Sequence, residues 1–309
     1  MCPTKIDIGA IYTAKPKDKK SMRLSAFKPV EKELIFDIDM TDYDEIRTCC
    51  SGASICHKCW KFMIVTIKII DVALREDFGF KHLLWVYSGR RGVHCWVCDE
   101  NARKLSNESR AAIVSYLAVI KGGTQVSKKV QLNRTLHPFL RRSLGIIENY
   151  FEDIVLKDQD VLGSEENWSK VLNCIQDDVV INLTRFRNKK NCPINGMGRI
   201  QNHLSKNGNE LVNELEHAAS ASGRKYSKKA EQLQICKLEI MFQYTYPRLD
   251  EAVSKNINHL LKRRVCVPIQ PDDCENLDPF EVPTVSSLYQ ELNLYIEGER
   301  KVHGKISCY

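Results

Sequence analysis

Hydrophobic residues occupy every second position from 34 to 40 of this chain, in the segment ELIFDIDMT, and acidic residues stand between them at 37 and 39. A period of two predicts a β-strand with one buried face and one polar face. Asp37 and Asp39 both fall on the polar face, roughly 7 Å apart along the strand. The apolar face carries four side chains: Leu34, Phe36, Ile38 and Met40. The strand therefore presents two carboxylates on the same side.

Helical spacing replaces this alternation further along the chain. Apolar residues recur every three or four positions from Trp60 to Phe78, which predicts a helix. Two apolar stretches around GRRG, residues 89–92, predict a β-hairpin with a glycine-flanked turn. A second helix is expected over residues 101–120, ended by Gly122 and Gly123.

Strand patterns disappear between about residues 134 and 235, where helix formers dominate. An apolar strand pattern returns over residues 238–250, followed by the helix-like stretch NINHLLK. We therefore predict an α/β (α+β) fold with a discontinuous core. Its first part spans residues 1–133, a helical insertion spans 134–235, and the second part with a C-terminal tail spans 236–309.

Composition narrows the class of protein only in part. A hydrophobic content of 43% and a charged content of 28% are those of an ordinary soluble globular protein. A net charge of +7 permits an anionic partner such as nucleic acid. The 13 cysteines form no regular disulfide framework, and we find neither a membrane-spanning run nor a signal-peptide core. We therefore expect a reducing compartment, the cytosol or the nucleus, and no membrane partner.

Asp37 and Asp39 are the sharpest chemical feature of the sequence. Two carboxylates on one strand face can converge on one or two Mg²⁺ ions and support phosphoryl transfer. A solvated polar face is the plain alternative, because an isolated Asp-x-Asp pattern is common. The turn SGRRGVH changes this balance, because its arginines Arg90 and Arg91, with His94, suit phosphate oxygens. Together the two features predict a nucleoside triphosphate site.

Two further residues are candidates for the same site. Asp250, in YPRLD, is a candidate third carboxylate, although an aspartate there can equally be a cap or a surface residue. Lys262, at the end of NHLLK, could contact a triphosphate, or it could simply oppose a helix dipole.

A second kind of metal chemistry follows directly in the chain. The pattern CC-x5-C-x2-C places four thiols within eleven residues, enough for a closed tetrahedral zinc site. An alternative set would join Cys56 and Cys59 to Cys95 and Cys98, but positions i and i+3 of a strand point to opposite faces. We therefore favour the first set for structural zinc: Cys49, Cys50, Cys56 and Cys59. His57 is a weaker, exposed substitute.

Four motifs occur here in the order typical of one family. These are FDIDMTDYD, the CC-x5-C-x2-C cysteines, FGFKHLLWVYSGRRGVHCWVCD, and YPRLD-x2-VS-x2-INHLLK. Over nearly the whole chain, the sequence resembles the eukaryotic DNA primase small (catalytic) subunit of the archaeo-eukaryotic primase family. The resemblance implies a mixed-sheet catalytic core, an inserted helical subdomain and a structural zinc motif at residues 49–59.

The resemblance also implies a role for individual residues. Asp37, Asp39 and Asp250 would hold catalytic Mg²⁺ or Mn²⁺, and the four cysteines would hold Zn²⁺. The implied nucleotide pocket has nine members: Ser88, Arg90, Arg91, His94, His259, Leu260, Leu261, Lys262 and, near the sugar, Asp7.

The implied function is DNA-directed RNA synthesis: short RNA primers made from ribonucleoside triphosphates on single-stranded DNA, for replication in the nucleus. The implied partners are the primase large subunit and the catalytic and accessory subunits of DNA polymerase α. The family carries several tens of residues before KIDIGA, and a longer basic loop where Arg263-Arg264-Val265-Cys266 stands. The alternative expectation is therefore a truncated, inactive copy that serves as a zinc-containing module for binding nucleic acid or a partner.

Overall fold

The computed structural model of the protein describes residues 6–121, 128–164, 166–167, 170–171, 174, 224–263 and 267–281. Much of the predicted insertion, the expected glycine stop at residues 122–123, part of the loop at 263–266 and the tail from 282 therefore lie outside the described residues. The domain division proposed from the sequence stays a prediction. None of the helices in the described ranges is long and apolar enough to span a membrane.

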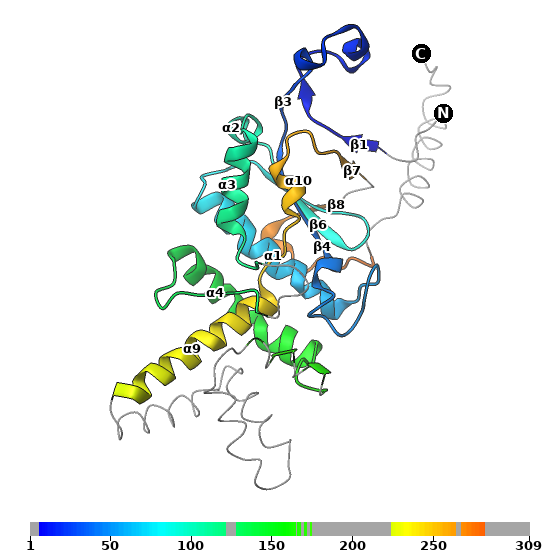
Figure 1. Cartoon of the computed structure of the whole chain (residues 1–309). Coiled ribbons are helices and arrows are strands. Elements are labelled where there is room, and N and C mark those ends of the chain that lie inside the picture. Colours follow the sequence, from blue (N-terminus) through cyan, green and yellow to red (C-terminus); the bar gives the residue numbers. More distant parts are fainter. Residues whose placement is uncertain are drawn as a thin grey trace, which may run out of the picture.

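A four-stranded sheet lies at the centre of the molecule, with its strands in the order β4-β6-β5-β8 (Figure 1). The bounds are β4 (Leu34–Asp39), β5 (Leu83–Tyr87), β6 (Gly92–Val97) and β8 (Val267–Ile269). Neighbouring strands of this sheet pair antiparallel. Strand β4 and the β5–β6 hairpin confirm the predictions from alternation and from GRRG, and the α/β fold class is confirmed.

The two faces of β4 meet different surroundings, as its alternating sequence predicts. Leu34, Phe36 and Ile38 are fully buried in the main core with helix α1 (His57–Glu76), which confirms the helix predicted from Trp60. Ile35 points to the other face and packs with Val253 and Leu261. Asp37 and Asp39 follow Ile35 by two and four positions, so their side chains point to the same second face, beside the short helix α10 (Glu251–Lys255).

The single helix predicted over residues 101–120 is broken into α2 (Glu100–Arg103) and α3 (Asn107–Leu117). Ser106 interrupts it, because its hydroxyl accepts the backbone N–H of Ser109 at 3.3 Å and caps α3. The buried guanidinium of Arg110 then donates to the carbonyl oxygens of Leu105 and Ala102, which a continuous helix would use internally. The break thus follows from local polar contacts that apolar spacing does not reveal.

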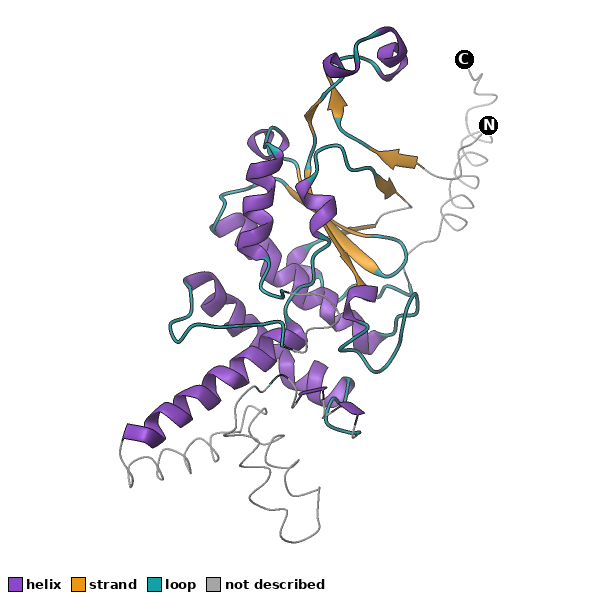
Figure 2. Ribbon diagram, in the orientation of Figure 1, coloured by secondary structure: helices purple, strands orange, loops and turns teal. Residues whose placement is uncertain are grey.

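The helical part contains α4 (Pro138–Phe151), the π-helical segment η4 (Glu152–Asp158) and α9 (Arg224–Thr245), with α4 packed against α9 (Figure 2). The strand predicted over residues 238–250 is wrong, because α9 continues to Thr245. Residues 239–248 are all buried. A helix buried on most sides reads as an unbroken apolar run, which periodicity cannot separate from a strand.

Smaller ribbons complete the described fold. Strand β1 (Ile6–Ile8) pairs antiparallel with β7 (Leu261–Arg263). The helix predicted over NINHLLK, residues 256–262, is wrong, because α10 ends at Lys255 and the segment forms a turn followed by β7. Strand β2 (Ile11–Tyr12) pairs with β3 (Pro29–Glu31), and between them lie the 3₁₀ turns η1 (Pro16–Ser21) and η2 (Leu24–Ala26). Two further turns are η3 (Met40–Tyr43) and η5 (Pro271–Asp273).

Candidate active site

Strand β4 and helix α10 bring three acidic residues together from distant parts of the chain. β4 is an edge strand, so its outer backbone groups need partners from elsewhere. The N–H of Asp250 donates to the carbonyl oxygen of Asp37 at 3.0 Å. The buried Ser254 hydroxyl donates to the carbonyl oxygen of Ile35 at 2.7 Å. The segment that begins α10 therefore covers the edge and places Asp250 next to Asp37.

Each of these carboxylates uses one oxygen, Oδ1, for contacts within the protein. Oδ1 of Asp39 accepts from Arg91 Nε at 2.6 Å and from the Thr41 N–H at 2.9 Å. Oδ1 of Asp250 accepts from the Ala252 N–H at 2.9 Å and caps α10, which is one of the roles that the sequence left open for this residue. Oδ1 of Asp37 lies 3.2 Å from His94 Nε2.

The second oxygens of these carboxylates are arranged differently. Within the described part of the chain, Oδ2 of Asp37, Asp39 and Asp250 makes no hydrogen bond. In each carboxylate, Oδ1 fixes the orientation of the group and Oδ2 is available to bind a cation. Carboxylate oxygens of this kind are the ligands that Mg²⁺ and Mn²⁺ prefer. The donor set therefore fits the divalent cation expected from the sequence.

The charges of the acidic residues influence one another. Partial burial acts to raise the pKa of Asp39, but hydrogen bonds from Arg91 and Thr41 outweigh it and hold that pKa below its ordinary value. Burial raises the pKa of Asp42 to about 6, and the charges of Asp39, Asp250 and Asp37 add to this rise. Asp42 is thus electrostatically part of the acidic site.

The β5–β6 turn holds the predicted phosphate-binding residues. Gly89 has a φ of 78°, and the N–H of Gly92 donates to Ser88 Oγ at 3.1 Å. The Tyr87 hydroxyl donates to the carbonyl oxygen of Arg90 at 2.9 Å, which closes the turn and leaves the Arg90 side chain exposed. A Cβ on Gly92 would lie 2.2 Å from the carbonyl oxygen of Ile38, so this position requires glycine.

His94 lies opposite Asp37 in the β4–β6 register. Its side chain is only 7% exposed, and its Nδ1 atom is buried without a hydrogen-bond partner among the described residues. The sequence implied a triphosphate contact for His94, and the structure places its ring beside the carboxylate of Asp37 on the neighbouring strand.

The other predicted nucleotide-pocket residues lie on or beside the β1–β7 ribbon. Asp7 and Lys262 are opposite one another in its register. Leu260 is 56% exposed, whereas Leu261 is 6% exposed and packs on Ile35 and Val253. The buried amine of Lys32 donates to the carbonyl oxygen of His259 and ties the start of this ribbon to the segment before β4.

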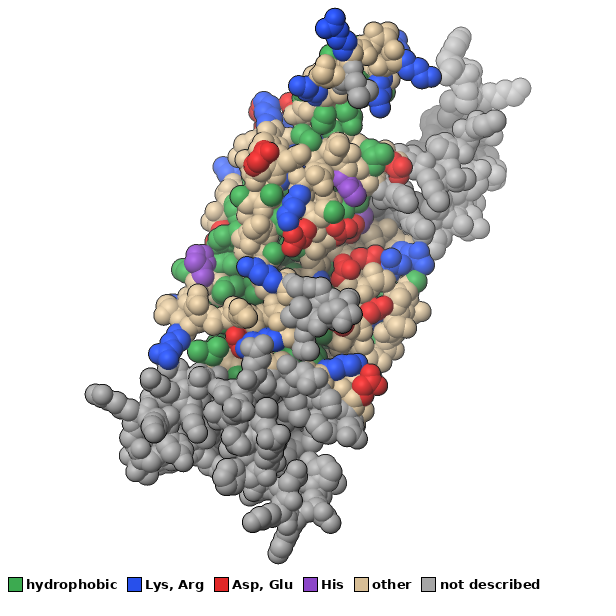
Figure 3. Space-filling model, in the orientation of Figure 1, with side chains coloured by type: hydrophobic (Ala, Val, Ile, Leu, Met, Phe, Trp, Pro, Cys, Tyr) green, Lys and Arg blue, Asp and Glu red, His purple; other side chains and the backbone are tan. Residues whose placement is uncertain are grey.

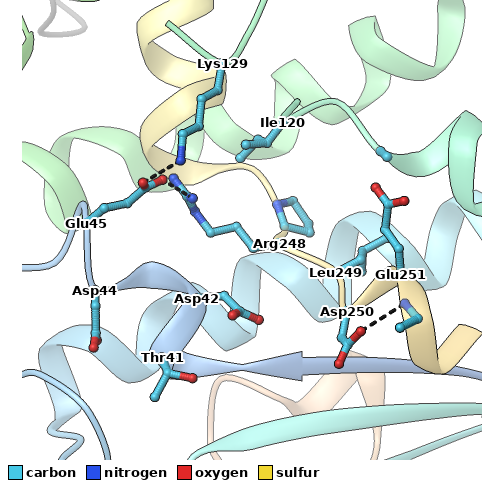
Figure 4. Close-up of a pocket in the computed structure, with 13 residues that line it drawn as sticks. Thr41, Asp42, Asp44, Glu45, Ile120, Lys129, Arg248, Leu249, Asp250 and Glu251 are labelled. Atoms are coloured by element: carbon cyan, nitrogen blue, oxygen red, sulfur yellow. Dashed lines mark hydrogen bonds and ion pairs between the residues drawn. The ribbon is translucent and has the colours of Figure 1, made fainter. Parts of the chain in front are cut away.

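A pocket of about 820 Å³ opens beside Asp42 and Asp250 (Figure 4). Glu45 lies in its wall and binds two cations. One carboxylate oxygen of Glu45 pairs with Lys129 Nζ at 2.5 Å and the other with the guanidinium of Arg248. The ion cluster joins η3, the segment after α3 and the segment between α9 and α10, and so orders the pocket around Asp250.

Four cysteine sulfurs form the second candidate metal site. The Sγ atoms of Cys49, Cys50, Cys56 and Cys59 all lie within 4.8 Å of one another, as predicted from their spacing. Cys56 and Cys59 sulfurs are 3.9 Å apart, close to the ~3.8 Å edge of a tetrahedron with Zn–S bonds of ~2.3 Å. The four thiols therefore fit a zinc ion. The alternative with Cys95 and Cys98 is not among the clusters found in the described residues.

The chemistry of these thiols also suits a metal. Burial acts to raise the pKa of Cys56, but N–H groups at the start of α1 and the neighbouring thiols outweigh it and lower that pKa to about 7. Burial, together with the neighbouring thiols, raises the pKa of Cys49 and Cys50 to about 11. A bound dication is therefore needed to keep all four sulfurs as thiolates.

Two buried side chains support the cysteine cluster from outside. The Arg47 guanidinium donates to the carbonyl oxygen of Ser54 at 2.8 Å and lies 3.8 Å from Cys59 Sγ. Gln159 Oε1 accepts the N–H groups of Thr48 at 2.8 Å and Cys49 at 3.3 Å. Gln159 follows η4, so the helical part of the chain holds the cysteine loop in place.

Sequence reasoning missed several supporting residues, including Thr41, Lys32 and Gln159. Thr41 had a local signal, because an aspartate followed two positions later by threonine is a capping pattern. Lys32 and Gln159 had none, because their partners are 227 and 111 residues away in the chain.

Comparison with known proteins agrees with this geometry. A protein-family model described as DNA primase small subunit matches residues 36–274. The chain is 42% identical to the DNA primase small subunit of Schizosaccharomyces pombe over 304 residues, which cover 95% of this chain and 64% of that protein. It is 40% identical to the Drosophila melanogaster DNA primase small subunit, covering 95% of this chain and 67% of that protein. For the Saccharomyces cerevisiae protein of the same description the identity is 36%, covering 94% and 70%.

The chain therefore belongs to the DNA primase small subunit family. It spans about two thirds of the length of the curated relatives that it matches. The matched region contains residues 36–39 of β4, the β5–β6 hairpin and the start of α10, which form the candidate active site, and it also contains the cysteine cluster.

Proposed function

We propose that this protein is the catalytic small subunit of a DNA primase, which synthesises short RNA primers on single-stranded DNA for replication. The observation that best supports this proposal is the arrangement of three carboxylates: Asp37, Asp39 and Asp250. Each is oriented through one oxygen and has a second that makes no hydrogen bond to the described residues. The relatives' name, DNA primase small subunit, supports the same conclusion.

Mg²⁺ or Mn²⁺ held by these three residues would supply two-metal nucleotidyl-transfer chemistry, which activates a primer 3′-hydroxyl and neutralises charge on the triphosphate. The protein's part is to keep the carboxylates ionised and aligned. Arg91 and Thr41 do so for Asp39, and the backbone bond between Asp250 and Asp37 sets the relative position of the other two.

The basic turn would receive the triphosphate of the incoming ribonucleotide. The exposed Arg90 guanidinium can form a forked pair of hydrogen bonds with phosphate oxygens. Ser88 accepts a hydrogen bond from Gly92, so its own hydroxyl hydrogen is available to donate. The turn leads directly into β6, which carries His94 and pairs with β4. A phosphate bound at the turn would therefore lie at the end of the strand next to Asp37 and Asp39.

The cysteine cluster has a different role in this proposal. Zn²⁺ bound by four thiolates has no open coordination position, so it stabilises the loop at residues 49–59 and takes no part in the reaction. The small-subunit description of the relatives supports assembly with a larger primase subunit, and we extend this to the subunits of DNA polymerase α in a nuclear complex.

Incorporation of radiolabelled ribonucleotides on a single-stranded DNA template with Mn²⁺ tests the proposal directly. Asp37→Ala and Asp37→Asn are expected to abolish primer synthesis while the unfolding transition stays cooperative. Asp272→Asn, which neutralises an exposed carboxylate on η5, is the matched control and should retain activity. Normal primer yield from both Asp37 variants would overturn the assignment. A fully inactive wild-type chain that still binds zinc and DNA would instead support the alternative of a binding module.

A further inference from the structure

The segment between β2 and β3 carries an unusual concentration of positive charge. Residues 12–29, which we call the basic lobe, contain one acid, Asp18, and six basic residues: Lys15, Lys17, Lys19, Lys20, Arg23 and Lys28. All six basic side chains are exposed. Among the residues that the structure describes, none of the six forms a salt bridge. For comparison, the net charge of the whole chain is +7.

Contacts within the basic lobe hold these charges on a folded scaffold. The N–H of Thr13 donates to the carbonyl oxygen of Lys28 at 3.0 Å, and its hydroxyl donates to that of Ala26 at 2.6 Å. The rings of Tyr12 and Phe27 stack with centroids 4.5 Å apart and an interplanar angle of 11°. The ammonium group of Lys19 lies 5.5 Å from the centre of the Phe27 ring.

The lobe forms a projecting end of the molecule, where lysine and arginine side chains gather (Figure 3). Apolar surface lies next to this charge, because Ile11 is 60% exposed and Val30 is 45% exposed. A surface that mixes cations with aromatic and aliphatic groups is typical of proteins that bind single-stranded nucleic acid, where phosphates meet cations and bases meet apolar surface.

The lobe also stands in a fixed relation to the candidate active site. β3 leads into β4 after only two residues, so Pro29 and Asp37 are eight residues apart on a nearly extended chain. Eight residues span at most roughly 26 Å in strand geometry. A stacked nucleic-acid strand rises about 3.4 Å per nucleotide, so about eight stacked nucleotides would cover this distance.

We propose that the basic lobe binds the phosphates of a single-stranded DNA or RNA segment that extends from the candidate active site. The inference rests on the proposed function in one respect, since that function supplies the strand. An acidic protein segment would be attracted by the same charge. The aromatic pair and the short chain distance to the acidic site favour nucleic acid.

Fluorescence anisotropy with 16-nucleotide DNA and RNA strands over a range of salt concentrations tests this surface. The variant Lys15→Gln/Lys17→Gln/Lys19→Gln/Lys20→Gln changes exposed side chains only, so its thermal unfolding should match that of the wild type. Each lost phosphate contact reduces the slope of log K against log salt by about 0.7. We expect Kd to rise at least tenfold at low salt and the slope to fall by about 2–3. The DNA and RNA arms identify which strand the lobe prefers.

The matched control neutralises four lysines on other elements: Lys81, Lys104, Lys157 and Lys170. Equal Kd and slope in the lobe and control variants would overturn the proposal. So would equal loss for a 4-nucleotide strand tethered at the active site, which is too short to reach the lobe. Oligoglutamate that binds the wild type as tightly as DNA, and loses binding equally in the lobe variant, would assign the surface to acidic proteins.

The measurement needs no catalysis, so it separates the two proposals. Performed in an Asp37→Asn background, it reports binding alone. Lobe-dependent binding by a wild-type chain that makes no primers would refute the proposed function and leave the lobe assignment standing. Primer synthesis by the wild type, together with unchanged strand binding in the lobe variant, would support the proposed function and refute the lobe assignment.

Discussion

The backbone N–H of Asp250 donates a hydrogen bond to the carbonyl oxygen of Asp37, at 3.0 Å. The two residues are more than 200 positions apart in the chain, and this bond aligns their carboxylates on one edge of the sheet. Asp250 therefore has a structural role, as the cap of α10, and a proposed catalytic role through its remaining oxygen.

These two roles of Asp250 can be separated by substitution. Asp250→Asn keeps a capping oxygen and removes the charge, so the free energy of unfolding should change by less than about 0.5 kcal/mol while primer synthesis is lost. Asp250→Ala also loses the cap and should cost about 1 kcal/mol more. Urea unfolding and nucleotide incorporation measure the two effects. Ser106→Ala, which removes the cap of α3, should cost a similar amount and retain activity; an active Asp250→Asn variant would contradict the proposed role.

Gly92 is predicted to be intolerant of any side chain. Gly92→Ala would place a Cβ 2.2 Å from the carbonyl oxygen of Ile38, so β4 and β6 must separate where Asp39 and Arg91 meet. We expect a loss of about 2–3 kcal/mol in urea unfolding. The same change at Gly145, in the interior of α4 with nothing within 4 Å of its Cβ, should stabilise by about 0.5–1 kcal/mol. Equal effects at both positions would contradict this packing.

Asp42 should make the metal-free protein less stable as pH rises. Its pKa is raised from 3.8 to about 6 in the folded state, so ionisation between about pH 4 and pH 6 disfavours folding. Asp42→Asn removes this penalty and should stabilise by roughly 1 kcal/mol above pH 6, a value reduced because water screens this half-exposed carboxylate. The difference should vanish below pH 4. Urea unfolding from pH 3.5 to 8 checks this, and Glu148→Asn, on the exposed face of α4, should show no such profile.

Gln159 should influence zinc affinity without being a ligand. Its side chain orders the N–H groups of Thr48 and Cys49, and its interaction with the Cys49 thiol opposes the burial-driven rise in that pKa. Gln159→Leu should weaken zinc binding by about 10–100-fold, measured by competition with a chromogenic chelator. Asn149→Ala, on the surface of α4, is the control. Unchanged affinity in Gln159→Leu would show that the loop holds its shape without η4.

The site was predicted from sequence where its parts are local, and missed where they are not. Alternation placed Asp37 and Asp39 on one face of β4, as the structure has them, and spacing grouped the four cysteines whose sulfurs lie together. The surroundings of Asp250 were predicted wrongly, because the last residues of α9 and those after it, 239–248, are all buried and their apolar run resembles a strand. The ion cluster of Glu45, Lys129 and Arg248 has no signature in the sequence, because its members come from three separate segments.

The sequence by itself determined the polarity of each strand face, the glycine-flanked turn and the cysteine loop, because these depend on residues a few positions apart. Only the tertiary structure decided that Asp250 joins Asp37, that Asp42 belongs to the same electrostatic site, and that Gln159 supports the cysteine cluster. Those relationships depend on how the edge of β4 is covered and on which buried polar groups must find partners across the fold.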